Sequence, residues 1–371
     1  MQMLVGIVGI SVPIYAAGMG ASPLLLGVIG ATGGLIYSFM PFVSGSLSDR
    51  FRRKIFISTS TLFYGLSCIL YALAENPSMF IPIKALEWVS VALFWPSTEA
   101  LLTEAGGSEL KGILRKFNLS WGSAMIVGPM IGGSLISALG AGIRAPFLLS
   151  SVISFTLSFL SIVMVWEPSI NKGAYGNGIS KRSLSKIKNN ANLIFMSVVS
   201  ILLFASVGGI VISLFPAYAA ELGIPAYEIG LIMLVNGLFR LAAFFGAYKI
   251  ERRIGKAYVF LAGSLTLSLA SALIVVSSTT PAFSISLSLL GFGTGILYAA
   301  SIEVILKSWS SAKGYAAGIF ESLIGAGYFL GPLVGGFVAE YFQSAPYILC
   351  SFISLAVSLL QTLYRMRKKK F

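Results

Sequence analysis

The chain is a series of long apolar runs separated by short polar stretches. A helix needs about 20 apolar residues to cross the hydrocarbon core of a bilayer. Runs of about that length occupy residues 1–18, 22–44, 55–73, 79–101, 114–139, 145–166, 192–219, 226–249, 257–278, 282–305, 313–340 and 345–364. The pattern predicts an all-α membrane protein with twelve transmembrane helices.

A polar segment, residues 167–191, divides these runs into two groups of six. It contains Lys, Arg, Pro, Gly, Ser and Asn, a composition that is typical of a linker. We therefore expect an N-terminal six-helix bundle over residues 1–166, a cytoplasmic linker over 167–191, and a C-terminal bundle with a basic tail over 192–371.

The two groups repeat one another at an offset of 203 residues. Pro13-x-Tyr15-Ala-Ala recurs as Pro216-x-Tyr218-Ala-Ala, and a Gly-Pro-x-x-Gly-Gly motif occurs in both halves. An even number of helices returns the chain to the same side, so the repeats are parallel and related by an axis along the membrane normal. The repeat copy of residues 192–219 would begin before Met1, and we expect the native start to lie upstream.

The charged residues are few, and the basic ones lie almost entirely on one side. Residues of charged type make up 11% of the chain and hydrophobic residues 56%, with a net charge of +13. Almost all Lys and Arg fall in alternate loops, and the other set of loops holds only Arg144. The bias predicts a cell-membrane protein with both termini in the cytoplasm and with cations next to anionic lipid, not nucleic acid.

The residue types exclude several kinds of chemistry. Histidine is absent, and the two cysteines, Cys68 and Cys350, lie inside apolar runs. The chain has no Ser/His or Cys/His pair, no metal-ligand cluster and no phosphate-binding Gly-Lys-Ser/Thr loop. We expect no enzymatic activity, no cofactor, no metal site and no use of ATP.

The segment Gly45-Ser-Leu-Ser-Asp49-Arg50-Phe-Arg52-Arg53-Lys54 resembles the loop after the second helix of the major facilitator superfamily. That pattern is Gly-x-Leu-x-Asp-Arg-x-Gly-Arg-Arg/Lys, and Arg52 stands in place of its second Gly. With the twelve spans and the two repeats, the resemblance implies the major facilitator fold.

The resemblance also implies a cytoplasmic gate formed by this loop and its degenerate copy in the second half, residues 249–256. Its expected residues are Gly45, Asp49, Arg50, Arg53, Glu251 and Arg252. The alternative is a loop that only sets the topology.

The Gly-Pro-x-x-Gly-Gly motif predicts close helix packing, because glycines four residues apart share one helical face. Its residues are Gly128, Pro129, Gly132 and Gly133 in the first half and Gly331, Pro332, Gly335 and Gly336 in the second. The first copy resembles the antiporter motif of the drug-exporting branches of the superfamily, with Ala124 where an upstream Gly is usual.

Charged residues inside the apolar runs are expensive in lipid and mark candidate functional sites. Lys84 and Glu87 lie three residues apart, so they share a helical face and can neutralise one another. The segment Lys84-Ala-Leu-Glu87-Trp88 resembles a fourth-helix pattern, Arg-x-x-Gln-Gly, whose basic residue is implicated in proton coupling in related exporters. The alternative is a permanent structural ion pair.

Two further charges depart from the internal repeat. Glu321 stands where the first half has Asn118, and Arg240 stands where it has Tyr37. We hypothesise that Glu321 faces the central cavity as a proton carrier or substrate contact, with Arg240 as its counter-charge. Alternatively, Arg240 reaches the membrane interface by snorkelling.

Together these features predict a secondary transporter that works by alternating access. The preferred function is proton-coupled export, by antiport, of a small amphipathic molecule or drug. The alternatives are an uptake symporter or uniporter for a metabolite, and a non-transporting membrane sensor or scaffold. The expected partners are a small-molecule substrate, protons and membrane lipids, and the resemblance implies a monomer.

Overall fold

The computed structural model describes residues 1–48, 51–106, 110–138, 143–166, 191–308 and 313–368. Every regular element in these ranges is helical. The elements are α1 (Gln2–Gly18), α2 (Pro23–Ser48), α3 (Arg53–Leu73), the 3-10 turn η1 (Pro77–Met79), α4 (Phe80–Gly106), α5 (Leu110–Ala138), α6 (Ala145–Met164), α8 (Ala191–Glu221), α9 (Ala226–Ile254), α10 (Lys256–Val276), α11 (Thr280–Ser308), α12 (Lys313–Ala339) and α13 (Ala345–Lys368).

Each predicted apolar run coincides with one of these helices. Among the described residues, eleven helices are long and apolar enough to cross a membrane, and α1, with 17 residues, is a shorter apolar helix. A helix forms its backbone hydrogen bonds internally, and this is necessary because lipid tails offer no hydrogen-bond partners. The predicted all-α membrane fold is confirmed.

The turns after α1 and α8 have the same geometry. Gly20 and Gly223, which are equivalent in the repeat, have φ values of +84° and +82°. In the first turn the amide of Ala21 donates to the carbonyl of Ala16 (3.0 Å), and the second turn has the equivalent bond. This is the geometry that ends a helix at a left-handed glycine. The repeat seen in the sequence is therefore a repeat of backbone structure.

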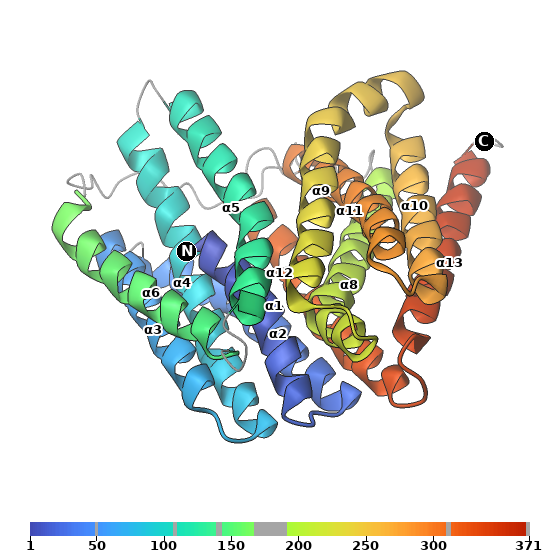
Figure 1. Cartoon of the computed structure of the whole chain (residues 1–371). Coiled ribbons are helices and arrows are strands. Elements are labelled where there is room, and N and C mark those ends of the chain that lie inside the picture. Colours follow the sequence, from blue (N-terminus) through green and yellow to red (C-terminus); the bar gives the residue numbers. More distant parts are fainter. Residues whose placement is uncertain (49–50, 107–109, 139–142, 167–190, 309–312, 369–371) are drawn as a thin grey trace.

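The helices of the two halves lie side by side, with α1 to α6 on one side and α8 to α13 on the other (Figure 1). We call the face at which α2, α9 and α11 end the basic face, because Lys54, Arg253 and Lys307 lie there. The opposite face is the one at which α2 begins and α12 ends. The contacts of α2 with α12 at Gly27 and of α5 with α9 at Gly230, described below, join the halves toward this opposite face.

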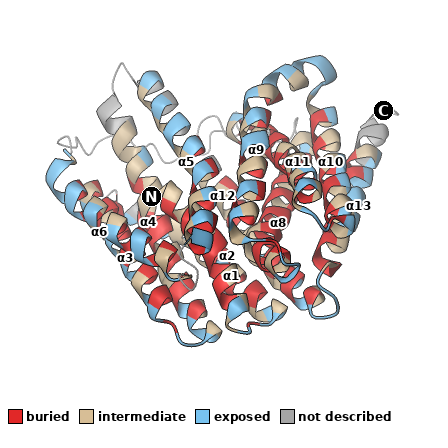
Figure 2. Ribbon diagram, viewed as in Figure 1, coloured by how far each residue is buried: buried red, intermediate tan, exposed pale blue. Residues whose placement is uncertain are grey.

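Exposed residues lie along the outer sides of the helices and buried ones lie between them (Figure 2). Many of the exposed residues are large and apolar, and small polar residues help to join helices inside the molecule. Val152 on α6 and Phe352 on α13 are exposed, as expected for side chains that face lipid. Inside the first half the hydroxyls of Ser58 and Ser161 lie 2.7 Å apart and join α3 to α6. Small residues let helix backbones approach closely where no hydrophobic effect drives them together.

Candidate functional site

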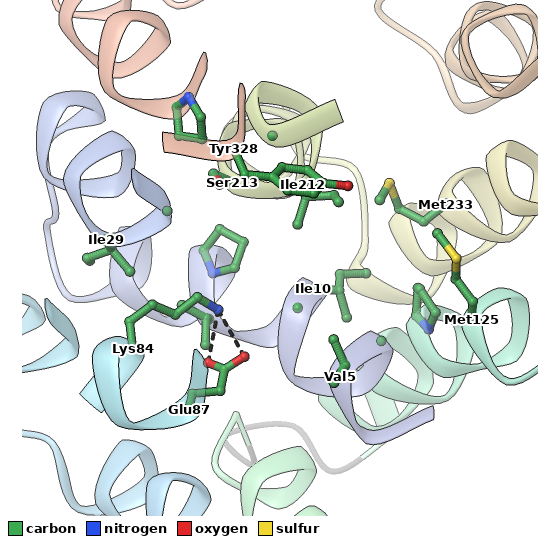
Figure 3. A pocket seen from close by; sticks show the side chains of 18 of the residues that line it. Val5, Ile10, Ile29, Lys84, Glu87, Met125, Ile212, Ser213, Met233 and Tyr328 are labelled. Atoms are coloured by element: carbon green, nitrogen blue, oxygen red, sulfur yellow. Dashed lines mark hydrogen bonds and ion pairs between the residues drawn. The ribbon is translucent and has the colours of Figure 1, made fainter. Parts of the chain in front are cut away.

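A cavity of about 190 Å³ lies between the two halves (Figure 3). Its lining comes from α1, α2, α4 and α5 of the first half and from α8, α9 and α12 of the second. The lining includes repeat-equivalent pairs, such as Gly6 with Gly209 and Pro129 with Pro332. The cavity therefore lies close to the axis that relates the repeats. Such a position is typical of transporter substrate sites.

Most of the lining is apolar. The side chains of Val5 and Ile10 from α1, Met125 from α5 and Met233 from α9 lie around the cavity in Figure 3. Methionine side chains are flexible and adapt to ligands of different shape. This surface suits a ligand with an apolar body.

The ion pair predicted on α4 is present at this cavity. Lys84 Nζ lies 2.9 Å from Glu87 Oε2, and both residues line the cavity. The hydroxyl of Tyr71 donates to the same carboxylate oxygen at 2.8 Å. Lys84 Nζ also lies 6.0 Å from the ring centroid of Trp88. Glu87, 1% exposed, is thus neutralised and hydrogen-bonded within the first half.

Arg240 lines the cavity from the other half and is 5% exposed. Its Nη2 donates to Asn236 Oδ1 at 3.0 Å, and Asn236 Nδ2 donates to the carbonyl of Leu287 at 2.8 Å. No acceptor in the described part of the chain takes the Nε–H of Arg240. The side chain is therefore buried at the cavity.

The hypothesis that Arg240 neutralises Glu321 is not supported by the geometry. Glu321 lies at the α2–α12 interface, where the hydroxyl of Tyr37 donates to its Oε2 at 3.1 Å. Glu321 is absent from the cavity lining, and the ion pairs of the described residues do not include one with Arg240. The physical reason is local: Asn236 lies one helical turn from Arg240, whereas α12 packs Glu321 against α2. Asn118 is on α5, and its proposed role stays a prediction.

The glycine motif packs partly against its own half. A Cβ on Gly128 would lie 2.9 Å from the Cα of Gly6 on α1, and one on Gly132 would lie 2.8 Å from the carbonyl oxygen of Ile7. Gly331 and Gly335 face α8 in the same way. These glycines therefore permit each motif helix to touch the first helix of its own half.

The last glycine of each motif faces the other half. A Cβ on Gly336 would lie 2.8 Å from the Cα of Gly27, where α12 crosses α2. A Cβ on Gly133 would lie 3.2 Å from the Cα of Gly230, where α5 crosses α9. The two crossings are equivalent in the repeat, and both lie toward the opposite face. Backbone contact at these crossings closes the space between the halves there.

A hydrogen bond to a helix start reinforces each crossing. The amide of Leu24 at the start of α2 donates to Glu340 Oε1 at 2.8 Å. At the equivalent place the amide of Tyr227 donates to Ser137 Oγ at 3.0 Å. Hydrogen bonds from the Leu24 amide and the Ser22 hydroxyl hold the pKa of Glu340 below its ordinary value. We call these two contacts the latches.

The expected gate residues are only partly described. Asp49 and Arg50 lie outside the described residues. Gly45 is in α2, and Arg53 is buried at the start of α3, where Nη1 donates to Ser48 Oγ at 3.2 Å. Glu251 pairs with Lys256 at 3.1 Å, and Arg252 is exposed near the end of α9. The role of these residues as a gate stays a prediction.

Several residues of the site were not identified from the sequence. Tyr71 and Asn236 hold Glu87 and Arg240, and Glu340 and Ser137 form the latches. Asn236 had a usable signal, since it is an amide four residues from a buried Arg on one helix face. Gly27 and Gly230 are equivalent in the internal repeat, but that equivalence does not reveal which helix each glycine touches.

The chain is similar to known membrane transporters over nearly its full length. It is 25% identical to the uncharacterized MFS-type transporter MJ1560 of Methanocaldococcus jannaschii, covering 91% of this chain and 87% of that protein. It is 22% identical to the quinolone resistance protein NorA of Staphylococcus aureus, covering 95% and 90%. Among solved structures, the nucleoside transporter NupG matches with a TM-score of 0.79 at 14% identity, covering 98% of this chain and 96% of that one.

A bacterial homolog of the human lysosomal transporter Spinster, in an inward-facing and occupied conformation, matches with a TM-score of 0.75 at 13% identity, covering 100% and 95%. The family model for the Major Facilitator Superfamily matches residues 1–256 and 197–370. The chain therefore belongs to the Major Facilitator Superfamily and is a multi-pass membrane transporter.

Proposed function

We propose that the chain exports a small amphipathic molecule by alternating access, with protons moving in the opposite direction. The observation that carries the proposal is the cavity between the halves, which combines an apolar lining with buried charges. Alternating access requires two bodies that rock about such a site. In this proposal the bodies are residues 1–166 and 192–371, working as a monomer.

We propose that the basic face lies in the cytoplasm and the opposite face outside the cell. The excess of Lys and Arg on one set of loops supports this orientation, with anionic lipid of the cell membrane as their neighbour. The glycine crossings and latches then close the outer side of the cavity. The cytoplasmic gate at residues 45–54 would close the other side in the alternate conformation.

Export is favoured over uptake by the nature of the cavity. Its lining is dominated by Ile, Val, Leu, Met, Gly and Pro, which offer little to a polar nutrient such as a sugar. NorA, named for quinolone resistance, is similar over nearly the whole chain and is consistent with this direction. A nucleoside transporter shares the fold, so the fold alone leaves uptake as the second candidate.

We assign the proton to an acid, because the chain has no histidine. Glu87 has a cation partner at the cavity, so a proton on it would release Lys84 to interact with substrate. Glu321 has the neutral hydroxyl of Tyr37 as its partner, across the interface between the halves. Protonation of Glu321 would change the charge at a contact that moves during transport.

The test is proton flux in sealed proteoliposomes with an imposed proton gradient. A panel of lipophilic cations, lipophilic anions, drugs and metabolites is added, and collapse of the gradient is recorded for wild type, Glu87→Gln and Glu321→Gln. We expect at least one compound to collapse the gradient in wild type and to fail with one of the variants. Lys116→Gln, an exposed change on α5 and outside both expected gate segments, is the control.

A different result would reject the coupling. If compounds equilibrate across the bilayer at equal rates in all variants without moving protons, the protein is a uniporter, and both acids are structural. If no compound crosses and the variants are indistinguishable from wild type, the chain is not a transporter of these classes.

A further inference from the structure

We infer that the substrate is an amphipathic anion, with one carboxylate or similar acidic group on a small apolar body. The inference rests on the proposed function and names the substrate class of the same cavity. The feature that carries it is an uncompensated positive charge in an otherwise apolar lining.

The charges that line the cavity do not balance. Two cations, Lys84 and Arg240, and one acid, Glu87, line it. Glu87 is already bound by Lys84 and by the hydroxyl of Tyr71. Arg240 has only the neutral Asn236 as a hydrogen-bond partner among the described residues. The lining therefore carries one net positive charge, and that charge lies on Arg240.

The hydrogen-bonding groups point to the same ligand chemistry. Two buried donors on lining residues lack an acceptor, Arg240 Nε and Trp88 Nε1. No lining residue has a buried side-chain acceptor without a donor. A buried donor without an acceptor is unfavourable, above all when it carries charge. A ligand that offers acceptors and negative charge would satisfy the site, and a cationic ligand would add a second unpaired positive charge.

The internal repeat shows that Arg240 is not one of the residues that both halves share. The equivalent residue in the first half is Tyr37, and the equivalent of Asn236 is Gly33. The matching turn of α2 therefore carries neither residue. The pair Asn236 and Arg240 supplies the polar groups that α9 contributes to the cavity.

The cavity is large enough to hold a small apolar body. A cavity of about 190 Å³ is slightly larger than an engineered cavity of about 150 Å³ that takes up benzene. A ligand with one aromatic ring, or a branched chain of similar size, next to its acidic group fits in this volume. Guanidinium groups bind carboxylates through strong charge-assisted hydrogen bonds.

The test compares three ligands with the same body: 4-ethylbenzoate, 4-ethylbenzyl alcohol and 4-ethylbenzylamine. Their Kd values are measured by calorimetry on the full chain in lipid nanodiscs, without a proton gradient. We expect the carboxylate to bind wild type at least about tenfold more tightly than the alcohol, a difference of about 1.4 kcal/mol, and the amine to bind more weakly still.

The variants separate the role of Arg240 from general effects on the fold. Arg240→Gln should remove the preference for the carboxylate, whereas Arg240→Lys should keep part of it. Arg253→Gln makes the same change at an exposed site on the same helix and should leave the preference intact. If Arg240→Gln does not fold, the comparison of the three ligands on wild type and Arg240→Lys still decides.

Four outcomes would overturn the inference. The first two are equal or tighter binding of the amine or the alcohol to wild type, and no binding of any of the three ligands. The other two are a preference for the carboxylate that persists in Arg240→Gln, and a preference for the carboxylate that is absent in Arg240→Lys. The assay is also independent of the proposed function. A chain that binds the carboxylate but couples no proton flux loses the proton-coupled mechanism and keeps this substrate class. If the chain exports a cation in exchange for protons, only the inferred substrate class is wrong.

Discussion

At the scale of single residues, the charges of the cavity break the internal repeat. Lys84 and Glu87 correspond to Leu287 and Leu290, and Arg240 corresponds to Tyr37. The repeated positions build the shape of the cavity, and the unrepeated ones supply its charge. Specific chemistry in this fold is therefore located where the two halves differ.

The ion pair of Lys84 and Glu87 should matter most for stability when only one partner is removed. Lys84→Met leaves a buried carboxylate without its cation and should lower the free energy of unfolding by about 3 kcal/mol. The double variant Lys84→Met/Glu87→Gln should recover most of that loss, because Gln can still accept from Tyr71 and carries no charge. The measurement is thermal unfolding in detergent micelles.

The control for this pair is Lys249→Met, the same change at an exposed site on α9. If the single and the double variants are destabilised equally, the pair is not coupled in the folded protein.

At the scale of elements, glycine contacts such as those at the two helix crossings limit how closely the halves approach. Gly27 with Gly336 and Gly230 with Gly133 place backbones in contact, and any side chain there must push the helices apart. Overpacking of a close contact costs about 1–3 kcal/mol. The conformation that is closed at the opposite face depends directly on these glycines.

Gly336→Ala should therefore favour separation of the halves at the opposite face. Spin labels at Leu73→Cys and Val276→Cys, exposed and repeat-equivalent positions on α3 and α10, report that separation by pulsed electron resonance. We expect the ratio of open to closed molecules to rise about fivefold or more, since even about 1 kcal/mol shifts a two-state ratio by that factor. The native cysteines, Cys68 and Cys350, are buried and give little background labelling.

The matched control is Gly246→Ala on α9. A Cβ there would meet only the flexible end of Ile250, at 3.8 Å. Unchanged distances in both variants would mean that the crossings do not limit the approach of the halves.

The helices could be predicted almost completely, because a bilayer imposes a minimum apolar length and every run except the first reached it. The roles of individual glycines could not. Gly132 and Gly133 are adjacent in the sequence, yet one faces α1 and the other faces α9. Which neighbour a helix face meets depends on packing between distant segments, and no local pattern contains that information.

The partners of the buried charges could likewise be predicted in one case and not in the others. Lys84 and Glu87 lie on one helix turn, so spacing alone predicted their contact. The partners of Arg240 and Glu321 were expected from opposite charge, and the structure instead gives Asn236 and Tyr37. A charge inside a membrane protein needs a hydrogen-bond partner nearby, and that partner need not be an ion.

At the scale of the whole molecule, closure of the opposite face should depend on pH through only one of the two latches, the one that contains an acid. Glu340 can take up a proton, whereas its counterpart Ser137 cannot. Hydrogen bonds in the closed conformation hold the pKa of Glu340 below its ordinary value of 4.5. Closure is therefore stabilised while the carboxylate is ionised, and this stabilisation is lost as the pH falls through and below that range.

Acidification from pH 6 to about pH 3, through and below the ordinary pKa of Glu340, should accordingly increase the separation between the labels at Leu73→Cys and Val276→Cys. Glu340→Gln keeps an acceptor for the Leu24 amide but cannot ionise, so its distances should not change over this interval. A wild-type response that persists unchanged in Glu340→Gln would assign the pH dependence to another group.

The paired crossings also carry information about origin. The surface around Gly27 on the first half touches Gly336 of the second, and the surface around Gly230 on the second touches Gly133 of the first. Each half thus presents both sides of one contact, as the subunits of a two-fold symmetric dimer do. A single half-length ancestor would already have held the complete interface for pairing with a second copy of itself. Duplication and fusion of such an ancestor would need only a linker, and would leave each half free to acquire its own charges.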